Sequence, residues 1–289
     1  MAEQHTPRSL IVTFYGAYGR SAPGPVPVAS LIRLLGAVGV DAPSVRSSVS
    51  RLKRRGFLVA DRTAEGAAAY GLSTEARELL EDGDRRIYGY RDAVAGGVDA
   101  AGVPGEEAGP APGEVGEAGW VLAVFSVPEQ ERHKRHLLRS RLARLGFGTA
   151  APGVWIAPAR LYDEARHTLE RLQLRPYVEL FRGEHLGFAP TVEAVGRWWD
   201  LTAIAKQHEE FLDRHEPVLR GWQSGREPAP QEAYHDYLLA LDSWRRLPYA
   251  DPGLPTALLP SDWPGDRSAA VFAELHARLH TAGAAYARL

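Results

Sequence analysis

One predicted helix near the start of the chain carries the side chains best suited to chemistry. At about 100° per residue, one face of this helix and its flanks gather only hydroxyl groups and cations. These residues are Ser44, Arg46, Ser47, Ser50, Arg51, Lys53 and Arg54. No acidic residue occurs from Ser44 to Arg55. Hydroxyls and arginines of this kind bind phosphates and base edges, so the face predicts contact with the DNA major groove.

The opposite side of the same helix predicts burial. Val45, Val49 and Leu52 recur at helical spacing and form one narrow apolar stripe. Asp41 is suited to cap the first turn, and Gly56 is suited to end the helix. The sequence therefore predicts a helix with defined ends that buries one stripe and presents a basic face.

The segments around this helix predict a winged helix-turn-helix. An apolar helix over 28–38 precedes it, and two strand-like runs from 57 to 73 predict a hairpin, or wing. On this scaffold we expect Ser47, Ser50 and Arg51 to read base edges. The expected phosphate contacts are Arg46, Lys53, Arg54 and, on the hairpin, Arg62. The alternative is a basic helix face that only meets solvent.

Charge is unevenly distributed, although 34 Lys and Arg nearly balance 36 Asp and Glu over the whole chain. Residues 1–80 hold ten Arg and Lys against six Asp and Glu, whereas residues 93–289 hold 21 against 26. A basic N-terminal part on an acidic remainder is typical of a protein in which one part binds a polyanion. A small excess of this kind can also arise by chance.

A composition break divides the chain. The stretch 93–119 has no aromatic residue and no cation, and it is rich in Ala, Gly, Pro and Glu. It cannot bury enough apolar surface to fold alone, which predicts a linker. We therefore expect a DNA-binding domain over 1–92, a middle domain over 120–190 and a helical C-terminal domain over 191–289.

The middle segment predicts a ferredoxin-like α/β sandwich, because its expected elements follow the order βαββαβ. Beyond it the pattern is helical, with helices expected at about 191–222, 231–246 and 266–287. The Pro-rich segment between the last two is too apolar for a linker and should pack against them. The fold class is thus a multidomain α+β protein with an N-terminal winged helix-turn-helix.

The absence of cysteine excludes disulfides, thiolate nucleophiles and cysteine-ligated metal centres. The apolar run Trp120–Phe125 is too short to cross a membrane, and the first residues show no secretory signal. We therefore expect a cytoplasmic protein with no membrane partner.

Four stretches resemble the PaaX family of transcriptional repressors, and the resemblance covers nearly the whole chain. They are SVRSSVSRLKRRGFL at 44–58, WVLAVFSVPE at 120–129, LGFGTAAPGVWIAP at 145–158 and DPGLPTALLPSDWPG at 251–265. The last stretch is the most specific, because a basic helix with a wing would fit many regulator families. The segment 93–119 is longer than the resemblance leads us to expect.

The resemblance implies a homodimeric repressor of an operon for aromatic-acid catabolism, such as phenylacetate degradation. It also implies release from a double-stranded DNA operator by an acyl-CoA thioester such as phenylacetyl-CoA, with no other cofactor. The family's middle domain is similar to the Cas2 fold. The two winged-helix domains of one dimer would enter successive major grooves about 34–36 Å apart.

Two pairs of residues are candidates for holding such a small-molecule effector. They are Trp198 with Trp199, which can line an aromatic pocket, and Arg245 with Arg246, which can bind phosphates. Arg132 and Arg135 raise the same possibility. Core packing for the tryptophans and a solvated surface for the arginines are the commoner roles.

The Cas2 likeness also raises a metal-dependent nuclease as the alternative function. Such nucleases are similar in placing a metal-binding Asp at the end of the first strand, but here Phe125 is followed by Ser126, Val127 and Pro128. Without that carboxylate, Mg²⁺ lacks a ligand. The histidine spacings do not match a zincin helix, and no G-x-S-x-G, P-loop or dinucleotide motif is present. We therefore expect a regulator with no metal site and no catalytic residues; a thioesterase-like acyl-CoA-binding protein is a third possibility.

Overall fold

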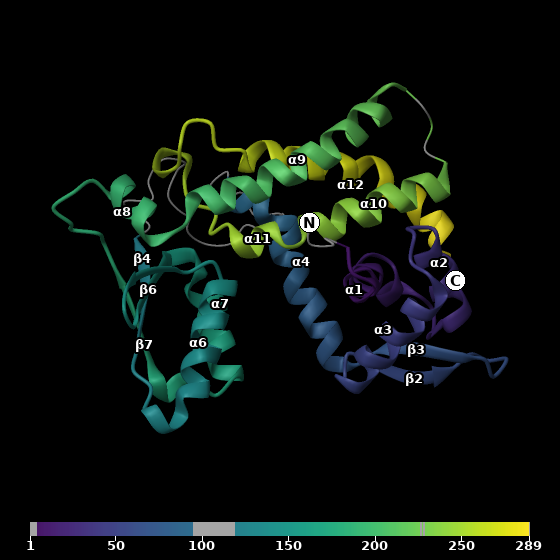
Figure 1. Ribbon diagram of the computed structural model, residues 1–289, viewed down its shortest axis with the longest axis horizontal. Coiled ribbons are helices and arrows are strands. Elements are labelled where there is room, and N and C mark those ends of the chain that lie inside the picture. The colour runs from purple at the N-terminus through teal and green to yellow at the C-terminus, as the bar shows by residue number, and fades with distance from the viewer. Residues whose placement is uncertain (1–4, 95–118, 226, 228, 289) are drawn as a thin grey trace, which may run out of the picture. The chain divides into compact units, whose positions relative to one another are not determined.

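The computed structural model describes residues 5–94, 119–225, 227 and 229–288 (Figure 1). These residues form two compact units, and each unit is built from segments far apart in the sequence. The first unit comprises Met1–Tyr88, Glu210–Arg246 and Arg267–Leu289, and the second comprises Gly89–Glu209 and Leu247–Asp266. The predicted linker over 93–119 lies almost wholly outside the described residues. The predicted division of the chain into three consecutive domains stays a prediction.

The N-terminal part of the first unit contains helices α1 to α4 and a small antiparallel sheet. The elements are α1 (Pro7–Ala17), β1 (Val26–Pro27), α2 (Val28–Gly36), α3 (Ala42–Arg54), β2 (Leu58–Arg62), β3 (Ala68–Leu72) and α4 (Thr74–Val94). The strand order is β1-β3-β2. The predicted hairpin is confirmed as β2 and β3. Strand β1 is an addition to the prediction, since two residues are too few to show a periodic pattern.

Apolar stripes hold these helices together. Helix α1 buries Leu10, Ile11 and Phe14, and α2 buries Leu31 and Leu35. Figure 1 shows α1, α2 and α3 close together above the β2–β3 hairpin, and both α1 and α2 contact α3. Helix α3 is therefore fixed on one side by apolar packing, which determines the direction in which its other side faces.

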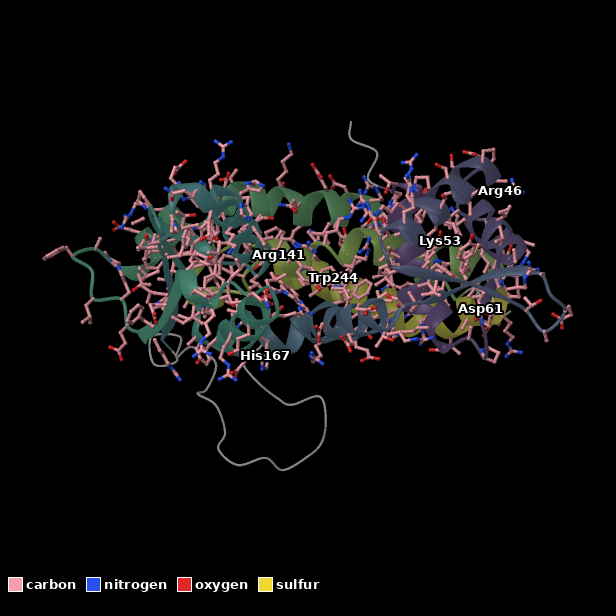
Figure 2. All side chains as sticks on the ribbon, turned by 90° about the horizontal axis from the view of Figure 1, so that it is seen from below. Arg46, Lys53, Asp61, Arg141, His167 and Trp244 are labelled. Atoms are coloured by element: carbon pink, nitrogen blue, oxygen red, sulfur yellow. The ribbon has the colours of Figure 1, made fainter. Side chains whose placement is uncertain are left out.

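The C-terminal helices α10 (Pro230–Trp244) and α12 (Gly265–Ala287) complete the first unit, together with the second half of α9 (Leu201–Gln223). Trp244 is buried, its ring stacks on Phe272 at 5.0 Å, and its indole Nε1 donates to the Ile87 carbonyl at 2.9 Å (Figure 2). Helix α1 packs directly on α10. The N-terminal helices thus share one core with the C-terminal helices.

The second unit contains a four-stranded antiparallel sheet with two helices. The elements are β4 (Trp120–Phe125), α6 (Arg132–Arg144), β5 (Gly148–Ala151), β6 (Val154–Pro158), α7 (Tyr162–Arg171) and β7 (Val178–Gly183). The strand order is β5-β6-β4-β7, so the two strands at the centre are not neighbours in sequence. This βαββαβ arrangement confirms the predicted ferredoxin-like fold. Helices α6 and α7 cover one face of the sheet, with Leu138, Leu142 and Leu169 in the core (Figure 1).

Other segments cover the second face of the sheet. Trp120 and Ile156 from the strands pack with Trp199 and Leu254. The expectation of one helix over 191–222 is wrong: α8 (Thr191–Trp198) ends before the extended residue Trp199, and α9 begins after Asp200. The Asp200 carboxylate accepts a hydrogen bond from the Ala203 amide at 2.9 Å and so caps α9, which explains the break.

The Pro-rich segment after α11 (Leu247–Ala250) begins with four buried residues, Asp251 to Leu254, and becomes exposed further along. Its Asp251 is 2% exposed and accepts hydrogen bonds from the Tyr90 hydroxyl at 2.7 Å and the Gly253 amide at 2.6 Å. His208 Nε2 lies 3.0 Å from the same carboxylate. Arg160 donates to the Gly253 carbonyl at 2.8 Å. The segment expected to pack on the last two helices therefore belongs mainly to the second unit, because its polar and apolar contacts are made there.

Candidate nucleic-acid interface

Both ends of α3 are fixed by local hydrogen bonds. The Asp41 carboxylate accepts from the Ser44 amide at 2.8 Å and from the Ser44 hydroxyl at 2.7 Å, and these bonds lower the pKa of Asp41. At the other end, the Gly56 amide donates to Lys53 and the Phe57 amide donates to Leu52, both at 3.0 Å. This pair of bonds is a Schellman motif, with Gly56 at a φ of +72°. The predicted cap and stop are confirmed.

The buried side of α3 follows the predicted stripe. Val45, Val49 and Leu52 are at most 3% exposed, and Ser48 is buried beside them. Ser48 was not predicted to be buried; a small hydroxyl side chain gives no periodic signal of its own. The stripe packs on α1 and α2, so the helix cannot rotate without exposing it.

The other side of α3 is exposed to solvent. Its exposed residues are Arg46, Ser47, Ser50, Arg51, Lys53 and Arg54. One Arg51 guanidinium nitrogen donates to the Ser47 hydroxyl at 3.0 Å, one helical turn away. Figure 2 shows Arg46 and Lys53 on this helix. We call this set the α3 basic face. Ser44, also predicted to contact DNA, is only half exposed, and its hydroxyl is bound to Asp41.

The hairpin beside α3 brings one cation and two acids. Arg62 is exposed and donates to the Gly66 carbonyl at 2.8 Å across the loop. Asp61, labelled in Figure 2, and Glu65 are also exposed, and sequence reasoning gave them no role. Acidic groups repel phosphate, so a phosphate contact from the hairpin depends on Arg62 alone.

The four effector candidates do not lie together in one unit. Trp198 and Trp199 belong to the second unit, where Trp199 donates to the Gly146 carbonyl at 2.9 Å and both rings pack near Trp120. Arg245 and Arg246 belong to the first unit and bind the Asp242 carboxylate. All four therefore make structural contacts, and their role in binding an effector stays a prediction.

The first unit contains a groove that the sequence did not predict. It has a volume of about 740 Å³ and is lined by α9 and α10 residues, including Trp222, His235 and Asp236, and by Ala37 from the turn between α2 and α3. Asp236 accepts one hydrogen bond from Trp222 Nε1, and its other carboxylate oxygen lies 2.8 Å from His235 Nδ1. The His235–Asp236 hydrogen bond raises the pKa of His235. No local pattern could reveal the groove, because its walls come from three separate segments.

The described part of the chain contains no group of three His, Cys, Asp or Glu side chains placed to hold a metal ion. Among the same residues, no helix has the length and apolar character needed to cross a membrane.

The substitution Gly56→Ala is expected to lower the free energy of unfolding by about 1 kcal/mol, because a side chain at this left-handed position is strained. Gly36→Ala is the matched control. Gly36 lies in α2 with open space around it, so alanine there should leave stability unchanged or raise it. Thermal melting of both variants checks this expectation. Equal melting temperatures for the two would show that the end of α3 does not depend on Gly56.

The fold and the α3 basic face define a class of protein in which a basic helix on a helical scaffold accompanies a ferredoxin-like unit. Three family models match consecutive parts of the chain. They are the PaaX-like protein over 6–76, the PaaX protein central Cas2-like domain over 115–195 and the PaaX-like protein C-terminal domain over 199–289. Together they cover most of the sequence, so the chain belongs to the PaaX family, and the predicted resemblance is confirmed.

Two relatives extend this finding. The transcriptional repressor PaaX of Escherichia coli (strain K12) is 23% identical over 282 residues, which cover 96% of this chain and 82% of that protein. The uncharacterized protein Rv0674 from Mycobacterium tuberculosis has a similar fold, with a TM-score of 0.57 and 18% identity over 99% of this chain and 100% of that chain. The chain is thus a member of a regulator family and not an enzyme, and the nuclease alternative has no support.

Proposed function

We propose that this chain is a cytoplasmic, DNA-binding transcriptional repressor whose residues 1–92 act as a winged helix-turn-helix. The observation that carries the proposal is the α3 basic face, with six exposed hydroxyl or cationic side chains and no acid within the helix. Helices α1, α2 and α3 followed by the β2–β3 hairpin have the order of elements that a winged helix-turn-helix requires. The relative in Escherichia coli is named a transcriptional repressor, which agrees with this role.

The side chains of the α3 basic face suit two kinds of contact. Arg51 can form a forked pair of hydrogen bonds with guanine, and Ser47 and Ser50 can bind base edges. Arg46, Lys53, Arg54 and Arg62 would bind phosphates and supply affinity that does not depend on sequence. As a homodimer, the protein would place two readers about 34–36 Å apart on a pseudo-palindromic operator.

We further propose an acyl-CoA thioester, such as phenylacetyl-CoA, as the effector that releases the repressor from an operon for aromatic-acid catabolism. A tenfold loss of DNA affinity requires about 1.4 kcal/mol of coupling between the effector site and the reader. The groove beside Ala37 is a candidate site, since one of its walls is the turn that leads into α3. The predicted residues Trp198, Trp199, Arg245 and Arg246 are the other candidates.

A binding titration on the DNA upstream of this protein's own gene tests the proposal. It should run at about 150 mM salt with excess non-specific competitor, which suppresses binding to phosphates alone. We expect tight binding that resists the competitor and is released by one thioester from a panel of acyl-CoAs. Specific binding that no thioester affects would refute only the proposal of an acyl-CoA effector. Loss of all binding in competitor would refute the repressor.

A further inference from the structure

A second helix of the protein shows a basic pattern like that of α3. Helix α6 has thirteen residues, with six Arg and Lys and no acid. These cations are Arg132, Lys134, Arg135, Arg139, Arg141 and Arg144. The helix belongs to the ferredoxin-like unit, for which the proposed function needs no contact with DNA.

Two of the six cations are bound by the protein itself. Lys134 contacts the Glu131 carboxylate and the Tyr177 hydroxyl. Arg135 donates to the Val127 carbonyl at 2.7 Å and to Glu129 at 3.2 Å. These contacts pair the two acids that precede the helix, Glu129 and Glu131, with Arg135 and Lys134.

Three of the remaining four cations of α6 are exposed to solvent. Arg132, Arg139 and Arg144 are exposed, and His136 and Ser140 lie exposed between them. On the opposite side, Leu138 and Leu142 are fully buried against the sheet. In the part of the chain that the structure describes, no ion pair joins these three arginines to an acid. Arg132 and Arg139 are seven residues apart and share one side of the helix, whereas Arg144 lies about 140° around the axis from Arg139. We call these three exposed arginines the α6 basic row.

Positive charge is crowded at the C-terminal end of α6, where Arg141 lies near Arg144 and Arg171. Arg141, labelled in Figure 2, is partly buried, and its Nε has no hydrogen-bond partner among the described residues. Burial lowers the pKa of Arg141, and the nearby charges of Arg144 and Arg171 lower it further. Clustered arginines repel one another, and a bound anion would relieve that repulsion.

We propose that the α6 basic row binds the phosphate backbone of double-stranded DNA without sequence preference, as a contact separate from α3. Thirteen helical residues span about 20 Å, long enough to follow several phosphates of one strand. The three exposed cations are spread along the length of the helix, which fits an extended polyanion. Like α3, α6 carries serine and arginine side chains and no acid, and such side chains bind phosphates.

The test compares two triple variants of the full chain that remove equal charge. The first replaces Arg132, Arg139 and Arg144 by alanine. The control replaces three exposed arginines that each pair with an acid one helical turn away: Arg166 with Glu170, Arg220 with Glu216 and Arg278 with Glu274. The dissociation constant for a duplex of arbitrary sequence is measured from about 50 to 200 mM salt.

Each lost phosphate contact should reduce the slope of log affinity against log salt by about one, so the first variant should lose about two to three. The control should keep the wild-type slope. Equal slopes for both variants would overturn the proposal, whatever effect the first variant has on the release of DNA by acyl-CoA. Failure to find any operator would refute the proposed repressor and leave this comparison intact, because the duplex is of arbitrary sequence.

A second measurement tests the proposal without the triple variant, in case that variant does not fold. The sequence has no cysteine, so Ser140→Cys gives one site for a photo-crosslinker on the exposed face of α6, with Ser261→Cys as the control. We expect crosslinks to the duplex from position 140 and none from position 261. Equal yields from the two positions would overturn the proposal.

Discussion

Replacing Asp242 by alanine is expected to lower the free energy of unfolding of the first unit by about 3–5 kcal/mol. Asp242 is completely buried in α10 and accepts hydrogen bonds from the Ser9 hydroxyl at 2.6 Å and the Thr13 hydroxyl at 2.7 Å. His5 Nδ1 lies 2.9 Å away, and Arg245 Nε donates at 3.2 Å. Alanine leaves these donors and cations without their acceptor, and that loss is costly in a buried place.

The contact joins distant parts of the chain. Ser9 and Thr13 lie in α1, more than two hundred residues before Asp242. The carboxylate therefore fastens the helix that supports α3 to the C-terminal helices. Thermal melting and urea unfolding measure the loss. Asp213→Ala, an exposed acid on α9, is the control and should change stability little. A melting temperature for Asp242→Ala equal to that of the control would contradict this account.

The same carboxylate predicts how stability depends on pH. Burial raises the pKa of Asp242, but His5, Arg245, Ser9 and Thr13 lower it more, to about 2. A pKa below the unfolded value of about 3.9 means that the stabilisation is complete above that pH. It is lost as the pH falls from about 4 through 2, and it amounts to roughly 2.5 kcal/mol. The wild type should lose this increment on acidification, and Asp242→Ala should not.

Arg51→Ala is expected to weaken binding to the specific operator by about 1–3 kcal/mol, or roughly 5- to 150-fold. Arg51 is exposed at the centre of the α3 basic face, and its bond to Ser47 holds the guanidinium along the helix surface. Such an arginine can recognise a guanine by two hydrogen bonds, so its loss should also relax the sequence preference.

Titrations of the operator and of a duplex of arbitrary sequence measure both effects. Arg278→Ala, an exposed arginine paired with Glu274, is the control of equal charge. An equal loss on both duplexes would make Arg51 a phosphate contact. No loss beyond that of the control would remove it from the interface.

The sequence predicted those parts of the fold that depend on local signals. The ends of α3 were predictable because Asp41 and Gly56 act on their own neighbouring backbone groups. The stripe of Val45, Val49 and Leu52 was predictable because helical spacing alone defines it. The βαββαβ order of the second unit followed from alternating strand and helix patterns.

The features that the sequence did not predict depend on contacts between distant residues. Asp242 looks like any acid on a helix, and only the fold places it against α1. The sequence predicted one continuous helix through Trp198 and Trp199. In the structure α8 ends at Trp198, and the Trp199 indole donates a hydrogen bond to the Gly146 carbonyl. The groove beside Ala37 has walls from three segments and no pattern in any one of them.

The most direct test of the central claim is to map where position 47 lies on bound DNA. Because the sequence has no cysteine, Ser47→Cys provides one attachment site for a DNA-cleaving reagent on the α3 basic face. Ser224→Cys, exposed at the end of α9, is the control. We expect cleavage from position 47 only, confined to the two operator half-sites, which lie about one helical turn or a multiple of it apart. Uniform cleavage, or equal cleavage from both positions, would contradict the claim that α3 reads DNA.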